Sequence, residues 1–365
     1  SEDKQLDGVV VTGVRRRNTE TAMISNIKNA LTVSTGISAA QIVKTSDSDA
    51  AEIIKRVPGI SLIENRFIIV RGLSQRYNNV SINNGAVPSS EADGRAFSFD
   101  IIPSSNIDNM MIIKSPTAEL PGDFSGGFIK ISTKNMPDEN SLSLSVGTGI
   151  NTVTHFKDFS LLQSSSTEWL GFDRCARPLS KDFPSHLGSM TDPSQITYYT
   201  KTGFNNDWNV KTFRPLPDLK LNLTWNRKIG DKVGTILTFG YSNANKTIPD
   251  MQNTRYGIYS ATADVPTIEK NYIDNQFTNE VKINAMNNWS FILDSRNRFE
   301  FRNLFSQIGK NRFTERYGTS TVSGEYYENQ TEMLYSSRLS YVGQLAGLHT
   351  LDEDMTQTLN WTVDY

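Results

Sequence analysis

The residues most able to do chemistry are few and scattered in this chain of 365 residues. Cys175 is the only cysteine, so no disulfide can form within the chain. The three histidines, His155, His186 and His349, have no spacing typical of a metal site. The sequence contains no nucleophile elbow, phosphate loop or zinc-type pattern, and the lone G-x-G at 147–149 lies inside a strand pattern. We therefore expect no enzyme, no catalytic residues, no metal and no cofactor.

Composition narrows the class of protein further. The hydrophobic fraction is 37% and the formal net charge is −2, which gives no electrostatic reason to expect a nucleic-acid partner. Low hydropathy still allows a membrane protein, because strands that alternate apolar and polar residues dilute the apolar signal. The sequence opens on polar residues without a signal peptide, so an exported protein would be present in its processed form.

The first third of the chain predicts a small α+β domain. Helices are expected over Glu20–Leu31 and from Ala50 to Val57, the second capped from within 46–49 and ended by Pro58-Gly59. Short β-rich stretches then predict a small mixed sheet. They are Ile60–Ile63, Phe67–Arg71, Val80–Ile82, Ile107–Lys114 and Phe128–Thr133.

Beyond a breaker cluster at 136–140, alternation of period two dominates. Leu142, Leu144 and Val146 share one face, and Leu219, Leu221, Leu223 and Trp225 follow the same pattern. Apolar-out, polar-in strands suit a lipid-facing barrel wall, although a soluble β-sandwich would alternate too. Tight turns are expected at 230–232, 294–297 and 352–354, with long loops near 151–217, 247–275 and 312–328. This count gives about seven strands.

Several ordered pieces between Ile68 and Lys134 resemble the plug domain of TonB-dependent outer-membrane transporters. They are Arg71-Gly72-Leu73, the Asn83-Asn84-Gly85 turn, the strand that ends in K-S-P at 114–116, and Gly126-Gly127 followed by I-K-I-S-T-K. The resemblance implies an α+β plug domain followed by antiparallel transmembrane β-barrel strands. Three parts are expected: an N-terminal segment over 1–13, a plug over 14–135, and barrel strands with extracellular loops over 136–365.

Seven strands depart from this family's pattern, because single-chain bacterial barrels use even strand numbers. A plug of about 120 residues belongs inside a barrel of about 22 strands. We therefore expect an N-terminal portion of such a transporter, with a partial 22-stranded barrel.

The resemblance also implies function: TonB-dependent import of a bulky or scarce solute across the bacterial outer membrane, with the N-terminus in the periplasm. Val9, Val10, Val11 and Thr12 resemble the Ton box, the peptide that TonB pairs with by strand addition, although an internal edge strand would have the same composition. The partners implied are TonB and its inner-membrane motor, outer-membrane lipid and lipopolysaccharide, a small-molecule, glycan or peptide substrate, and a possible surface lipoprotein. The alternative is a plug-bearing receptor that acts in signalling or in an envelope assembly without transport.

Site residues follow from the same resemblance. Arg71 is a candidate plug–barrel latch, or simply an arginine that needs a carboxylate to offset its desolvation. Gly72, Gly85, Gly126 and Gly127 are expected to serve turns and close packing. Outward loops supply the candidate substrate contacts, since arginine and aromatic residues often anchor binding surfaces. These are Gln75, Arg76, Tyr77, Arg95, Phe97 and Trp169.

Overall fold

The structure is a computed structural model that describes residues 19–365, except 31, 46, 48, 64–66, 88, 90–95, 100, 101, 103, 138, 164, 175, 176, 205, 206 and 353–356. The chain divides into two compact units, Ser1–Lys134 and Asn135–Tyr365. None of the helices in the described part is long and apolar enough to cross a membrane.

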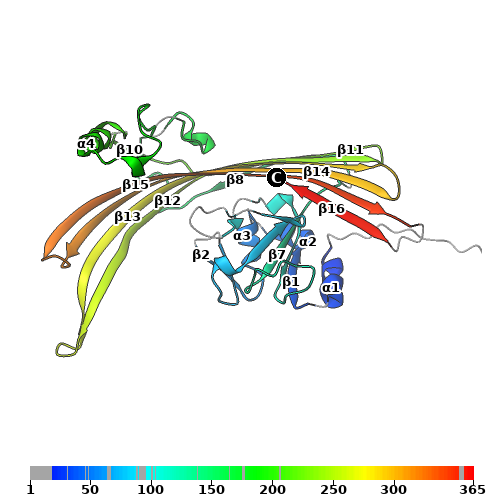
Figure 1. Cartoon of the computed structure of the whole chain (residues 1–365), viewed down its shortest axis with the longest axis horizontal. Helices are drawn as coiled ribbons and strands as arrows, with labels where there is room; N and C mark the ends of the chain where they lie inside the picture. The colour runs from blue at the N-terminus through cyan, green and yellow to red at the C-terminus, as the bar shows by residue number, and fades with distance from the viewer. Residues whose placement is uncertain are drawn as a thin grey trace, which may run out of the picture. The chain divides into compact units, whose positions relative to one another are not determined.

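The first unit is built on a five-stranded mixed sheet in the order β1-β6-β7-β4-β5 (Figure 1). Its strands are β1 (Ser34–Ser38), β4 (Asn79–Ile82), β5 (Gly85–Ala86), β6 (Ile107–Ile113) and β7 (Phe128–Thr133). β4 and β7 pair in parallel and the other neighbours pair antiparallel. Strands β2 (Ile60–Ile63) and β3 (Phe67–Val70) form a separate antiparallel pair. The expected mixed sheet is confirmed for β4, β6 and β7, whereas β2 and β3 pair apart from it, and β1 and β5 are additions.

Helices surround this sheet and supply its core. They are α1 (Glu20–Asn29), α2 (Ala39–Lys44), α3 (Ala50–Ile54) and the short 3-10 turns η1 (Gln75–Tyr77) and η3 (Ser104–Asn106). Asp49 caps α3 by accepting a hydrogen bond from the backbone N–H of Glu52. Both expected helices are confirmed, each ending a few residues earlier than predicted. Ile53 and Ile54 of α3, and Ile112 and Ile129 of the sheet, are fully buried.

Two tight turns in this unit use consecutive residues with positive φ. Arg71 and Gly72 have φ of 55° and 77°, and Asn83 and Asn84 have φ of 52° and 69°. Two left-handed residues in succession make the type I′ geometry that matches the twist of a two-residue hairpin. Glycine and asparagine tolerate this region, so only Arg71 is strained there.

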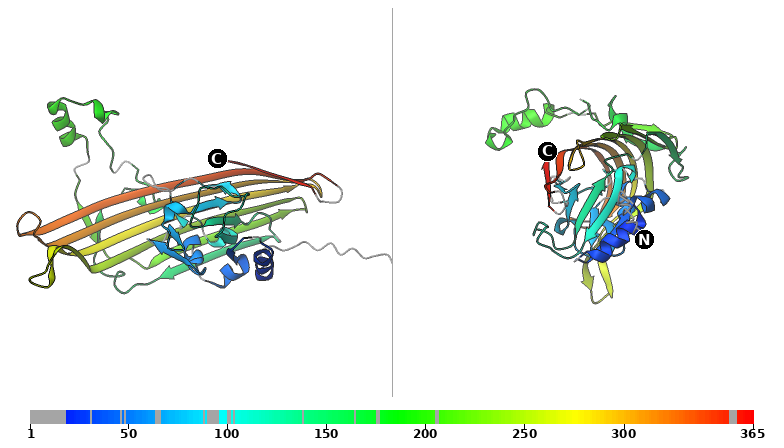
Figure 2. Two further views of the ribbon diagram at one scale, coloured as in Figure 1. Left: turned by 60° about the horizontal axis from the view of Figure 1, so that its bottom comes forward. Right: turned by 90° about the vertical axis from the view of Figure 1, so that its right-hand side faces the viewer.

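The second unit is one antiparallel sheet of seven long strands in the order β16-β15-β14-β13-β12-β11-β8, as expected. They are β8 (Ser141–Gly149), β11 (Asp218–Ile229), β12 (Val233–Ser260), β13 (Val265–Ile292), β14 (Asn297–Ser320), β15 (Tyr326–Thr350) and β16 (Thr358–Asp364). Among the described residues, β8 and β16 are the two edges of the sheet, which is therefore open. Figure 2 shows its pronounced curvature.

Directly paired residues place the apolar side chains on one face of this sheet. Leu144, Leu223 and Phe239 lie in one row, which Ala285, Phe305 and Tyr341 continue across the sheet. Paired residues point to the same side of a sheet, so these positions form a continuous apolar face. The opposite face carries polar residues, among them Lys282, Ser306 and Arg338.

Two of the three predicted long loops are wrong. Residues 247–275 and 312–328 are mostly strand, and the connections β12–β13 and β14–β15 span only 261–264 and 321–325. These strand extensions carry polar residues on both faces, so they lack the alternation by which a strand is recognised in sequence. The long connection between β8 and β11, over 150–217, is confirmed.

That connection carries small elements of its own. They are the antiparallel pair β9 (Phe159–Leu162) and β10 (Val210–Phe213), the 3-10 turns η4 (Glu168–Leu170) and η5 (Leu187–Ser189), and α4 (Pro193–Thr202). In Figures 1 and 2, α4 and β10 lie on the convex side of the curved sheet.

Candidate functional site

An exposed cation–aromatic pair marks the η1 turn of the first unit. The Arg76 guanidinium carbon lies 4.8 Å from the centre of the Tyr77 ring, and Arg76 Nη2 donates to the Tyr77 hydroxyl at 2.8 Å. Both side chains are exposed, while Gln75 is half-buried. Such a pair offers a flat aromatic surface, a positive charge and hydrogen-bond donors at one place, which suits recognition of a polar or anionic solute.

Hydrogen bonds and close packing with neighbouring segments hold the η1 turn in place. The Tyr77 carbonyl accepts hydrogen bonds from the backbone N–H groups of Ser125 and Gly126, and buried Asn78 donates to the Ile68 carbonyl at 2.7 Å. A Cβ at Gly126 would lie 2.2 Å from Asn78 Oδ1. A Cβ at Gly127 would lie 3.1 Å from a Val70 methyl group. The expectation that these two glycines serve close packing is thus confirmed.

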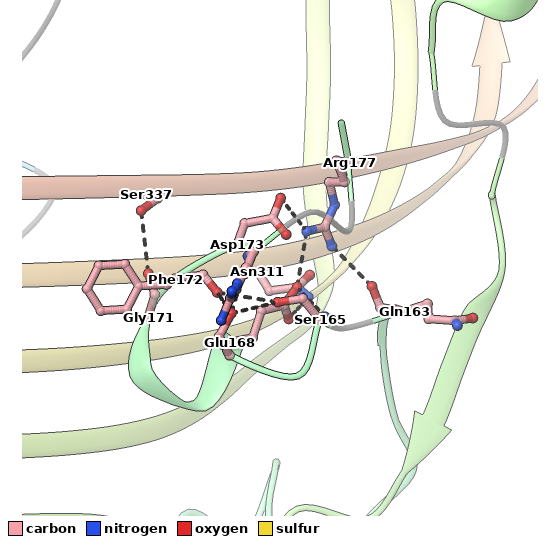
Figure 3. A network of polar contacts seen from close by, with 11 residues as sticks. Gln163, Ser165, Glu168, Gly171, Phe172, Asp173, Arg177, Asn311 and Ser337 are labelled. Carbon is pink, nitrogen blue, oxygen red and sulfur yellow. Dashed lines mark hydrogen bonds and ion pairs between the residues drawn. The ribbon is translucent and has the colours of Figure 1, made fainter. Parts of the chain in front are cut away.

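A second polar cluster lies in the β8–β11 connection of the other unit (Figure 3). Arg177 Nη1 contacts Glu168 Oε1 at 3.1 Å and Asp173 Oδ2 at 3.0 Å. Its guanidinium also stacks on the Tyr335 ring of β15 at 4.7 Å, and Asn311 of β14 donates to Glu168 Oε2 at 3.2 Å. The cluster therefore ties a loop to two strands that lie more than 130 residues away in sequence.

Burial alone would lower the pKa of Arg177, but its hydrogen bonds to Asp173 and Glu168 raise that pKa above the usual arginine value. Arg177 is thus a permanent cation here. The two carboxylates are largely buried as well, so the cluster is a charge-balanced clamp whose members depend on one another.

Gly171 brings the loop into direct contact with the sheet. Its φ is 78°, and its carbonyl accepts hydrogen bonds from Gln307 Nε2 at 2.5 Å and from Ser337 Oγ at 3.4 Å (Figure 3). A Cβ placed on Gly309 would lie 2.5 Å from the Gly171 Cα, so the sheet provides a glycine where the two backbones approach. Farther along the same face, Phe159 of β9 packs edge-on against Phe277 with ring centres 5.5 Å apart.

This clamp lies on the apolar face of the sheet. Gln307 pairs with Ile283 and Leu339, and Asn311 is four residues further along the same strand, so both side chains point to that face. The polar face carries different ion pairs, including Arg316 with Asp274 at 2.7 Å and Arg312 with Glu332 at 2.9 Å. Among the described residues, no group of three or more His, Cys, Asp or Glu side chains is arranged to hold a metal ion.

The first unit matches a known family. Residues 7–128 match the family model described as TonB-dependent Receptor Plug Domain. These residues belong to a TonB-dependent receptor plug domain. This match covers about a third of the chain, and the long antiparallel strands of the second unit follow it in the sequence. No curated protein matches the chain.

Solved structures give distant likenesses. The ferric enterobactin receptor PfeA of Pseudomonas aeruginosa, in complex with enterobactin, is 13% identical, with 92% of this chain and 46% of that one covered and a TM-score of 0.41. The siderophore receptor PiuA of Acinetobacter baumannii is 9% identical, with coverages of 88% and 43% and a TM-score of 0.39. The outer-membrane transporter YddB of Escherichia coli is 11% identical, with coverages of 87% and 44% and a TM-score of 0.41. The chain spans less than half the length of these structures.

The remaining predicted residues fall in different environments. Val9, Val10, Val11, Thr12 and Arg95 lie outside the described residues. Arg71 is exposed at the type I′ turn of the plug domain, so the desolvation argument for a carboxylate partner does not apply to it there.

Two aromatic candidates also differ from each other. Phe97 is buried, with its ring 5.0 Å from and perpendicular to that of Phe99. Trp169 is 60% exposed on η4, beside the clamp. The clamp residues Glu168, Arg177, Asn311 and Tyr335 were missed, because nothing in a single sequence links residues so far apart.

Proposed function

We propose that this chain belongs to a TonB-dependent importer of the outer membrane, in which the plug domain closes the lumen of a barrel that includes the seven strands described. The family match of residues 7–128, ahead of a sheet with one apolar and one polar face, is the observation that carries the proposal. An apolar face suits lipid and a polar face suits a water-filled lumen. The outer membrane holds no ion gradient to drive uptake, so import needs force from the inner membrane.

The TonB contact is proposed at Val9, Val10, Val11 and Thr12. An extended β-branched peptide gains affinity through main-chain hydrogen bonds when it joins the edge of a partner's sheet. Proline at Val10 removes one donor from that ladder.

Force applied at this segment would pass through α1 and then reach β1, the first strand of the plug. β1 is an edge strand of the plug sheet, paired with β6 alone in five antiparallel pairs from Ser34–Ile113 to Ser38–Asn109. A pull that enters at Ser34 loads these pairs one after another, so β1 can peel away while β6 and β7 stay paired. The packing is tight enough to hold at rest, since a Cβ at Gly36 would lie 2.9 Å from both the Met110 carbonyl oxygen and Met23 Sδ.

Solute recognition is proposed at the plug turn of Gln75, Arg76 and Tyr77, and at Arg95. We propose Arg71 as a latch that pairs with a carboxylate of the barrel lumen, which its exposure and permanent charge permit. The class of solute stays open among small molecules, glycans and peptides.

Uptake in cells with and without TonB tests the proposal. Val10→Pro is expected to abolish uptake while leaving solute binding intact, and Val10→Ile serves as the matched control. Equal uptake by the proline variant, or uptake that persists without TonB, would favour the signalling or assembly role instead.

A disulfide staple tests the peeling step. Thr35→Cys with Ile112→Cys, in a Cys175→Ser background, joins directly paired residues of β1 and β6, whose Cα separation of about 4.5–5.5 Å suits a disulfide. We expect the oxidised staple to block uptake and a reductant to restore it. The control staple, Ser81→Cys with Ala86→Cys, joins β4 to β5 away from the pulled strand and should leave uptake unchanged.

A further inference from the structure

Along β14, the apolar stretch of the apolar face ends at Gln307. Along β14 this face runs from Asn297 at the turn through Phe299, Phe301 and Phe305, and it becomes polar at Gln307. Ten residues separate Asn297 from Gln307, which matches the roughly 9–11 residues that a tilted strand needs to cross a bilayer. Asn303 lies within this stretch, but Tyr341 donates to its side-chain oxygen at 2.6 Å and its own amide donates to the Asn287 carbonyl.

The η4 turn meets the sheet at that same row. Gln307 is the residue that donates to the Gly171 carbonyl, and η4 contacts β13 and β14 there. The part of the loop nearest the apolar band is therefore η4 with Gly171 and Phe172, while the pair β9–β10 lies farther along the strands, over Phe277 and Phe313.

The η4 turn and the residues directly after it carry exposed aromatic side chains. Trp169 is 60% exposed and Phe172 is 36% exposed, and Figure 3 shows the Phe172 ring lying apart from the ionic network. They continue the exposed apolar surface of the sheet, where Leu339 is 60% and Tyr341 is 43% exposed. The clamp of Arg177 with Glu168 and Asp173 holds the turn rigidly at this level.

We propose that the η4 turn, residues 168–172, rests in the headgroup layer of the outer leaflet and anchors the first extracellular loop to the lipid surface through Trp169 and Phe172. Aromatic rings favour this layer because they are apolar with a polar edge. The lipid surface is the occupant because the turn adjoins the lipid-facing band on the same face of the sheet. Trp169 then contacts lipid on the outside of the barrel, and the solute pathway along the polar face does not include it.

Spin-label accessibility in the full-length protein, reconstituted in phosphatidylcholine–phosphatidylglycerol nanodiscs, tests this inference. Single cysteines are placed at Trp169, Leu339 and Trp208 in the Cys175→Ser background. Leu339 is the lipid reference. Trp208 is the matched control, since it lies in the same connection and is 70% exposed. The label at 169 is expected to collide with oxygen several-fold more than with a water-soluble nickel complex, as at 339, and the ratio should be reversed at 208.

Two outcomes would overturn the proposal. Nickel access at 169 equal to that at 208 would place the turn in water. Protection from both reagents would indicate a protein partner or a second copy of the chain. The inference rests on the outer-membrane location given under the proposed function. The label at 339 tests that location separately, because nickel access at 339 would contradict the location itself, whereas nickel access at 169 alone would contradict only the anchoring of the turn.

Loosening the clamp provides an independent measurement. Arg177→Met should lower the oxygen-to-nickel ratio at 169 severalfold and leave the ratio at 339 unchanged. An unchanged ratio at 169 would contradict the role given to the clamp.

Discussion

The plug strand β7 and the sheet strand β8 both alternate, yet they meet different surroundings. Ile129 and Ile131 of β7 are at most 1% exposed, whereas Leu142, Leu144 and Val146 of β8 are 66–71% exposed. The same period-two pattern thus builds a dry core in one unit and an open apolar face in the other. Alternation in the sequence specifies which side chains share a face of the sheet. Whether that face packs against protein or stays open depends on the other elements of the fold.

Truncating a buried side chain in the plug and an exposed one on the apolar face should give the largest difference in stability. Ile112→Ala removes a fully buried side chain and should destabilise the plug by about 2–5 kcal/mol. Leu144→Ala should change stability by no more than about 0.5 kcal/mol, because it leaves no protein cavity. Hydrogen exchange with mass spectrometry resolves plug and sheet peptides separately, and equal losses would contradict the distinction.

The clamp behaves as a small core on the apolar face. Arg177→Met leaves Glu168 and Asp173 without their cation and should cost up to about 3 kcal/mol of local stability. Arg214→Met is the matched control, since Arg214 pairs with Asp158 in the same connection but both side chains are about 70% exposed. Such a surface pair contributes at most about 1 kcal/mol. Exchange protection of residues 163–177 measures both, and similar losses in the two variants would refute the clamp.

Two glycines of the sheet provide a finer comparison. Gly309→Ala forces a methyl group against the Gly171 backbone and should cost about 1–3 kcal/mol in loop docking. Gly147→Ala meets its nearest atom at 3.6 Å, an ordinary contact, and should have little effect. Proteinase K cleavage of the loop in the folded protein measures loop docking. We expect faster cleavage in Gly309→Ala and no change in Gly147→Ala.

The smallest expected effect is a pH dependence in the plug. Arg56 donates two hydrogen bonds of 2.7 Å to Asp47 and holds the pKa of that carboxyl below its usual value. A lowered folded-state pKa stabilises the fold above the unfolded-state pKa of about 4, and this contribution is lost as the pH falls through the folded-state value. Arg56 is half exposed, so solvent screens the pair and the effect should be small.

The variant Asp47→Asn isolates this contribution. Its stability should fall below that of the unaltered protein at pH 6, and the difference should shrink as the pH falls toward 2. Urea midpoints of plug peptides, read by pulse-labelling hydrogen exchange at one fixed labelling pH, give the comparison. A difference between the two proteins that stays constant across this range would rule out titration of Asp47 as its cause.

Sequence patterns predicted much of this fold. The bounds of β2 and β7 match the expected ranges, because their apolar residues lie between clear turn signals. β1 was missed, since S-T-G-I-S has one large apolar residue and takes its place through pairing with β6. The outer halves of β12–β15 were missed for a related reason: they carry polar residues on both faces, so no alternation marks them.

The site was less predictable than the fold. Gln75, Arg76 and Tyr77 stood out by residue type, and their turn is exposed as expected. The clamp needed the paired register of β14 and β15 to bring Asn311 and Tyr335 to the loop. Trp169 was noticed as an aromatic residue in a loop, but only the fold reveals which face of the sheet that loop covers.

The length of the β12–β13 hairpin has a practical consequence. From Asn243, in the row just beyond Gln307, β12 continues for 17 residues to Ser260, roughly 55 Å along the strand. In the proposed importer, the tip at 261–264 would extend well beyond the lipid on the outer side of the membrane. An epitope tag inserted there should be displayed to antibodies on living cells, and phages or immune receptors approaching the cell would meet this tip early.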